Sequence, residues 1–176
     1  DYKEVDPISG KEYIVDSSGY HLVLLAKNKT GYRNLCKLIS IAWVDGEYRR
    51  PRIDKNILQQ YKEGLIVCSA CLGGEIAKLL TAKKYEEAEK SVLWFKEVFG
   101  DDYYLEIQNN GMPEQVMVKQ KLIQISRQLD IPLVATNDAH YLKKEDSYNH
   151  EILLCMQTGK RMTDEDRMRF SVDEFY

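Results

Sequence analysis

The feature that most constrains the fold is a regular alternation of short apolar runs with longer amphipathic stretches. The apolar runs have the length of strands and cover residues 21–26, 65–70, 103–108 and 131–136. Between them, apolar residues recur at helical spacing while Glu and Lys fill the opposite face, most clearly over 85–99. This order predicts an α/β domain with a mostly parallel sheet, either open or closed as a barrel.

Local signals place the helices between these runs. Thr30 is the expected N-cap of the first helix, and Pro113 is expected to open a later one. In the last helix we expect Tyr148, Ile152 and either Cys155 or Met156 to face inward. The full set of expected helices covers about 30–42, 54–61, 75–82, 85–99, 113–130 and 145–157.

Composition excludes several classes of protein. The formal net charge of −3 provides no overall basic field for nucleic acid, so any such contact must be local. No apolar run is long enough to span a membrane. Scattered cysteines predict a reducing cytosol, with Cys36 and Cys155 as packing residues on apolar helical faces. Cys68-Ser-Ala-Cys71 lacks a second ligand pair nearby, so we reject a zinc ribbon. The chain does not begin with Met, and we expect further sequence upstream of Asp1.

Polar residues follow two of the predicted strands directly. Asp138 and His140 come after the fourth strand, and Cys71 comes after the second. In a parallel sheet these three side chains share one rim, where a thiolate, an imidazole and a carboxylate suit zinc, and the last two also suit manganese. Alternatively, Asp138 caps a helix beside a surface His140, and Cys71 is a small buried residue.

Other ionisable residues carry weaker signals. His21 opens its strand, so a parallel sheet places it at the amino end, opposite the rim just described. His150 is expected to be solvated, and Glu106 is expected on an exposed or polar strand face. Arg49, Arg50 and Arg52 form a basic loop that can contact phosphate, although such a loop is often only solvated.

Three long segments resemble the PHP (polymerase and histidinol phosphatase) domain of bacterial replicative DNA polymerase III alpha subunits. They are Tyr20-His-Leu-Val-Leu-Leu-Ala-Lys-Asn-Lys-Thr-Gly-Tyr-Arg-Asn-Leu35, Glu63-Gly-Leu-Ile-Val-Cys-Ser-Ala-Cys-Leu-Gly-Gly-Glu75 and Pro132-Leu-Val-Ala-Thr-Asn-Asp-Ala-His-Tyr141. The ending Arg169-Phe-Ser-Val-Asp-Glu-Phe-Tyr176 resembles the exit from that domain toward the polymerase palm.

The resemblance implies a distorted (β/α)7 barrel with a cluster of metal ions, here incomplete. Carried over by motif, the metal ligands are His21, Cys71, Asp138 and His140, with zinc or manganese as the ion. The family's first motifs carry a His-x-His, and this chain has only three histidines, none of them two positions apart. The strands of those motifs are therefore expected upstream, and magnesium belongs to a polymerase site outside the chain. The implied organisation is a loop or hairpin over 1–20, a partial barrel over 21–159 and an exit segment over 160–176.

The implied function is part of a 3′→5′ exonuclease-type phosphodiesterase site in a polymerase that replicates DNA in the cytoplasm. The alternatives are a catalytically inactive scaffold for stability and docking, and a free-standing phosphoesterase of the same superfamily. Expected partners are DNA, the remaining polymerase domains, a proofreading exonuclease subunit and a sliding clamp. We assign no general base, and we expect the chain alone to be inactive because half a ligand set cannot enforce metal geometry.

Overall fold

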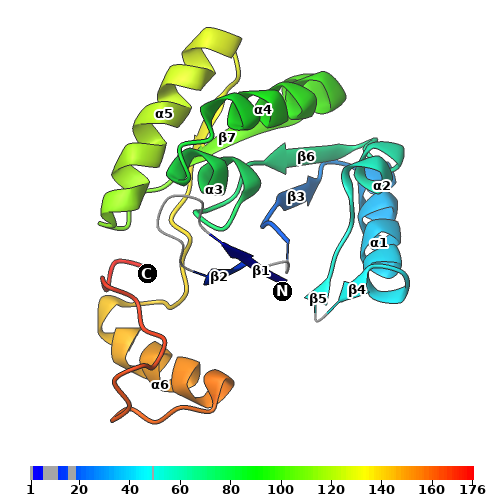
Figure 1. Ribbon diagram of the computed structural model, residues 1–176. Coiled ribbons are helices and arrows are strands. Elements are labelled where there is room, and N and C mark those ends of the chain that lie inside the picture. The colour runs from blue at the N-terminus through cyan, green and yellow to red at the C-terminus, as the bar shows by residue number, and fades with distance from the viewer. Residues whose placement is uncertain (1, 6–11, 16–18, 49) are drawn as a thin grey trace.

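A four-stranded sheet forms the centre of the molecule (Figure 1). The computed structural model describes residues 2–5, 12–15, 19–48 and 50–176. The strand order is β3, β6, β7, β8, with bounds Val23–Ala26, Leu65–Cys68, Tyr103–Ile107 and Leu133–Ala135. All four predicted strands are therefore confirmed, and helices alternate with them as expected for an α/β domain.

One strand direction differs from the prediction. β6, β7 and β8 are parallel, but β3 pairs antiparallel with β6. The cause is a close contact between the chain just after β3 and the turn before β6. Lys27 N–H donates to the Gly64 carbonyl at 3.0 Å, and a Cβ on Gly31 would lie only 1.8 Å from that same oxygen. The end of β3 is thus held at the start of β6, as is common for an edge strand of a mixed sheet.

Six α-helices lie among the described residues, close to the predicted ranges. α1 is capped by Asn28, whose side chain accepts from Gly31 N–H at 2.9 Å, so the expected cap at Thr30 was wrong. Asp54 caps α2 through the Ile57 N–H at 2.8 Å. The helices are α1 (Lys29–Val44), α2 (Lys55–Gln60), α3 (Glu75–Thr81), α4 (Tyr85–Phe99), α5 (Pro113–Leu129) and α6 (Ser147–Thr158), with 3-10 turns η1 (Gly100–Asp102) and η2 (Lys144–Asp146).

Two small antiparallel hairpins accompany the sheet. β1 (Tyr2–Val5) pairs with β2 (Glu12–Val15) inside the segment for which we expected a loop or hairpin. β4 (Glu47–Tyr48) pairs with β5 (Arg50–Pro51) between α1 and α2.

The hydrophobic core lies between the sheet and helices α3, α4 and α5, and Leu38 of α1 and Leu58 of α2 belong to the same cluster. Val67, Tyr103 and Leu105 supply fully buried strand side chains, and the Tyr103 ring stacks on Phe95 of α4 at 5.2 Å. Such contacts bury enough apolar surface to fix the helices against one face of the sheet. This rigid layer leaves the strand ends free to carry polar side chains.

The C-terminal part forms a separate layer around α6, with the last residues running back toward the sheet (Figure 1). Phe175 is buried even though 160–176 contains no helix or strand. Two burial predictions were wrong: Tyr148 is 61% exposed, and Cys36 lies on the exposed side of α1. None of the helices in the described residues has the length and apolar character needed to cross a bilayer.

Candidate metal centre

Cys71 and Asp138 follow β6 and β8 directly, so both lie at the rim formed by the carboxyl ends of β6, β7 and β8. Because β3 is antiparallel to β6, the amino end of β3 lies at this same rim. His21 N–H donates to the Gly73 carbonyl at 3.0 Å, and His21 forms a β-bridge with Gly74. The expectation that His21 lies at the opposite end of the sheet was therefore wrong.

His21 and Cys71 are in direct contact. His21 Nδ1 lies 3.4 Å from Cys71 Sγ, and Gly73 N–H donates to the same sulfur at 3.4 Å. Two ligands of one tetrahedral zinc ion, bound through sulfur and nitrogen, lie roughly 3.5 Å apart. The pair thus has the separation that a shared ion requires, which is also the length of a sulfur hydrogen bond.

The environment of Cys71 favours the neutral thiol when no cation is near. Burial raises the pKa of Cys71, the Gly73 N–H opposes this, and the negative charges of Asp138 and Glu106 raise the pKa further. Asp138 is therefore near enough to act on the sulfur electrostatically. A bound cation would reverse this preference, because metal binding stabilises the thiolate.

His140 lies in an aromatic cluster that α6 and the C-terminal segment build. Its ring lies 5.2 Å from both Phe170 and Phe175 and 5.5 Å from His150, and its Nδ1 lies 2.6 Å from the Asp138 carbonyl oxygen. His150 stacks on Phe170 at 5.3 Å, so the expectation of a solvated side chain was wrong. Burial lowers the pKa of His150, and the charge of the nearby His140 lowers it further.

Throughout the described part of the chain, no group of three His, Cys, Asp or Glu side chains is close enough to hold a metal ion. The structure brings His21 and Cys71 together and places Asp138 within electrostatic reach of the sulfur. It holds the His140 ring against the aromatic cluster instead. The rim thus presents a pair of ligands, and the full predicted set is not assembled.

A buried carboxylate behind the rim was missed by sequence reasoning. Glu106 on β7 was expected on an exposed or polar strand face, and it is only 7% exposed but lies among polar partners. Its Oε2 accepts from Ala70 N–H at 3.2 Å, its Oε1 accepts from the Thr136 hydroxyl, and its own N–H donates to Ser69 Oγ at 2.8 Å. Ala70 has a left-handed φ of 63° just before Cys71. Glu106 thus connects the ends of β6 and β8 beneath the candidate site.

The basic loop lies beside the rim. Arg50 is exposed and Arg52 is half-buried, while Arg49 lies outside the described residues. Arg50 and Arg52 line a cavity of about 860 Å³ that His21 also borders. A phosphate at this loop would therefore lie on the His21 side of the candidate centre. Contact with phosphate stays a prediction.

The PHP domain family matches residues 2–110. The DNA polymerase III subunit alpha of Borreliella burgdorferi is 50% identical over 157 residues, which is 89% of this chain and 14% of that protein. The proteins of the same name from Treponema pallidum and Deinococcus radiodurans are 45% and 42% identical over 94% and 98% of this chain. In each case the chain spans about 14% of the relative's length.

Proposed function

Because the chain belongs to the PHP domain family, we propose that it forms one side of a metal-dependent phosphodiesterase site in a bacterial replicative DNA polymerase. The observation that carries the proposal is the 3.4 Å contact between His21 Nδ1 and Cys71 Sγ at the rim of the sheet. The similarity to DNA polymerase III alpha subunits over most of the chain supports the replicative context.

The donor atoms fit a divalent transition metal. A thiolate and an imidazole favour zinc, and the Asp138 carboxylate would also suit manganese. The ion would supply Lewis-acid chemistry to a phosphodiester, for which the observed residues provide the holding groups. His140 remains a proposed ligand. Its Nδ1 lies against the Asp138 carbonyl oxygen, and metal-binding histidines commonly hold a carbonyl with one ring nitrogen while the other nitrogen binds the metal.

Other ligands would come from polymerase segments outside these 176 residues. The sheet is open in the described residues, with β3 and β8 at its two edges. A distorted (β/α)7 barrel would pair both edges with further strands and bring their ligands to the same rim. We propose that the 3′ end of a DNA strand is the substrate, with Arg50 and Arg52 beside the ion to meet its phosphates.

A second candidate function is a scaffold without nuclease activity. It is favoured by one observation, the absence of a three-ligand cluster in the residues that the structure describes. In this case the domain would contribute stability and docking for the polymerase and its replisome partners, such as a proofreading exonuclease subunit and a sliding clamp. Either role would place the protein in the bacterial cytoplasm.

Digestion of DNA by the full-length natural protein separates the two functions. We expect manganese- or zinc-dependent 3′→5′ degradation of a 5′-labelled single strand, lost in His21→Asn and in Cys71→Ser. Cys36→Ser is the matched control, because Cys36 is exposed on α1, a helix that carries none of the proposed ligands. Activity retained in both rim variants would refute the nuclease proposal. Metal bound by the wild-type protein without any digestion would favour the scaffold.

A further inference from the structure

A fully buried asparagine lies between the candidate centre and the end of the chain. Asn110 is 0% exposed and follows β7, and its Nδ2 donates to two carbonyls, Asn137 at 2.6 Å and Glu174 at 2.9 Å. Its Oδ1 accepts from Gln115 Nε2 at 2.9 Å, and its N–H donates to Gln115 Oε1 at 2.7 Å. Every polar group of this side chain is therefore used, as buried amides require.

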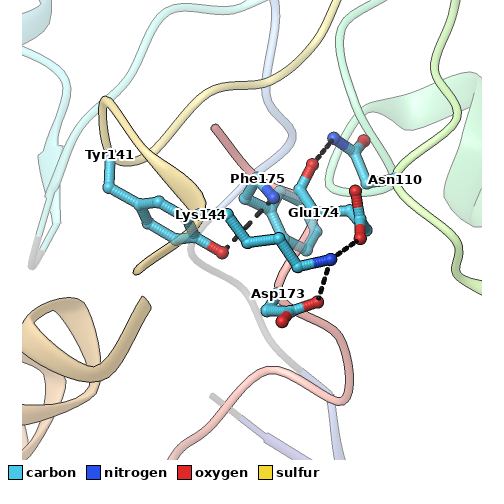
Figure 2. A network of polar contacts seen from close by, with 6 residues as sticks. All are labelled: Asn110, Tyr141, Lys144, Asp173, Glu174 and Phe175. Carbon is cyan, nitrogen blue, oxygen red and sulfur yellow. Dashed lines mark hydrogen bonds and ion pairs between the residues drawn. The ribbon is translucent and has the colours of Figure 1, made fainter. Parts of the chain in front are cut away.

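The two carbonyls belong to segments that also bind each other. His140 N–H and Tyr141 N–H donate to the Phe175 carbonyl at 2.7 and 3.3 Å, and Phe175 N–H donates to the Tyr141 hydroxyl at 3.3 Å. Figure 2 shows Asn110 on one side of this segment and Lys144 on the other, where Lys144 pairs with Asp173 and Glu174. Residues 173–176 are thus fastened to the loop that carries Asp138 and His140.

We infer that Asn110 is a positioning residue for the 137–141 loop, and that 173–176 forms a structural part of the candidate metal centre. The inference rests on the proposed function only in calling that centre a metal site. Asn110 fixes the carbonyl directly before Asp138, and through Glu174 it fixes the segment that receives the His140 N–H. An ionised Asp in its place has no side-chain donor, and Ala has neither a side-chain donor nor a side-chain acceptor.

The arrangement couples the two segments in both directions. If a metal ion binds Asp138, the loop is restrained, and the same hydrogen bonds restrain 173–176. Coupling between two sites is reciprocal. A change that displaces 173–176 should therefore lower metal affinity by the same factor by which bound metal stabilises the observed position of 173–176. Residues 173–176 are therefore coupled energetically to the candidate centre.

Hydrogen exchange of the full-length protein, measured by mass spectrometry with and without zinc, tests the inference. Asn110→Asp should speed exchange about tenfold or more in both 137–141 and 173–176, because buried hydrogen-bond donors to two carbonyls are lost. The matched control is Asn109→Asp, the same substitution at an exposed neighbour whose Oδ1 accepts from Lys119 at 3.3 Å. Zinc should slow exchange in 173–176 in the control and not in Asn110→Asp.

Exchange that matches the control, or that rises in only one of the two segments, overturns the inference whether or not zinc binds. Failure of the wild-type protein to bind zinc refutes the proposed function alone, since the paired rise in exchange needs no metal. If Asn110→Asp unfolds the sheet, judged by exchange in β6, Lys144→Met replaces it. Lys144→Met removes the exposed ion pairs of Lys144 with Asp173 and Glu174. Exchange should then become faster in both segments, and an unchanged exchange rate in the 137–141 loop overturns the inference.

Discussion

Gly73 is where a single added methyl group should disturb the candidate centre without replacing any of its ligands. A Cβ at this position would lie 2.8 Å from His21 Nδ1 and 3.1 Å from two further ring atoms. Real Cβ contacts essentially never fall below 3.0 Å, so the imidazole in Gly73→Ala must retreat by at least 0.2 Å (3.0 minus 2.8 Å), and by 0.6 Å (3.4 minus 2.8 Å) to reach ordinary van der Waals contact. Metal ligands must be held within about 0.5 Å of their working positions.

This displacement separates His21 from Cys71 and should lower zinc affinity by about ten- to a hundredfold, or roughly 1.4 to 2.7 kcal/mol. The assay is zinc titration of the full-length protein against a chromophoric chelator. Gly74→Ala provides the contrast, because its Cβ would meet the Ser69 carbonyl at 2.3 Å, a backbone atom that cannot turn aside. We expect that variant to lose stability before it shows a selective loss of zinc.

A double-mutant cycle with His21→Asn decides whether the methyl group acts through the imidazole. If it does, Gly73→Ala has almost no effect once His21 is already replaced, because the two changes remove the same interaction. The reasoning is refuted if Gly73→Ala folds normally and binds zinc within twofold of the wild-type protein. Full additivity of the two substitutions would refute it as well.

Two further predictions concern groups near the rim. Glu106→Gln should lower the free energy of local unfolding by about 2 kcal/mol and speed hydrogen exchange at the ends of β6 and β8. The reason is that the amide cannot accept from both Ala70 N–H and the Thr136 hydroxyl as the carboxylate does. The control Glu97→Gln, on the exposed side of α4, should leave exchange unchanged. Burial raises the pKa of Cys71, so at pH 7 iodoacetamide should label it more slowly than exposed Cys36, with a rate that climbs as pH rises toward that pKa and that zinc suppresses. Equal labelling of the two cysteines, with or without zinc, would contradict the assignment.

Much of the fold follows from local periodicity. The four strands lie where short apolar runs predicted them, and α5 begins at Pro113 as expected. The direction of β3 did not follow, because it depends on Gly31 packing against the Gly64 carbonyl, a contact between residues far apart in the chain. The cap of α1 was misplaced for a smaller reason: Asn28 and Thr30 both suit the position, and only backbone geometry chooses between them.

The candidate site was less accessible from the sequence. Motif resemblance pointed to His21, whereas a parallel sheet would have placed His21 at the wrong end, and the antiparallel pairing of β3 resolves the conflict. Glu106 and Asn110 carried only the signals of a polar strand position and a turn. Their burial is set by neighbours from β6, β8 and the C-terminal segment, which no local pattern shows. The aromatic surroundings of His150 likewise come from Phe170, twenty residues further along the chain.

Anomalous diffraction from crystals of the full-length protein soaked in zinc would show directly whether His21 and Cys71 hold one ion between them. We expect a peak about 2.0–2.1 Å from His21 Nδ1 and about 2.3 Å from Cys71 Sγ. Zinc density that is well occupied elsewhere on the protein and absent from this pair would contradict it.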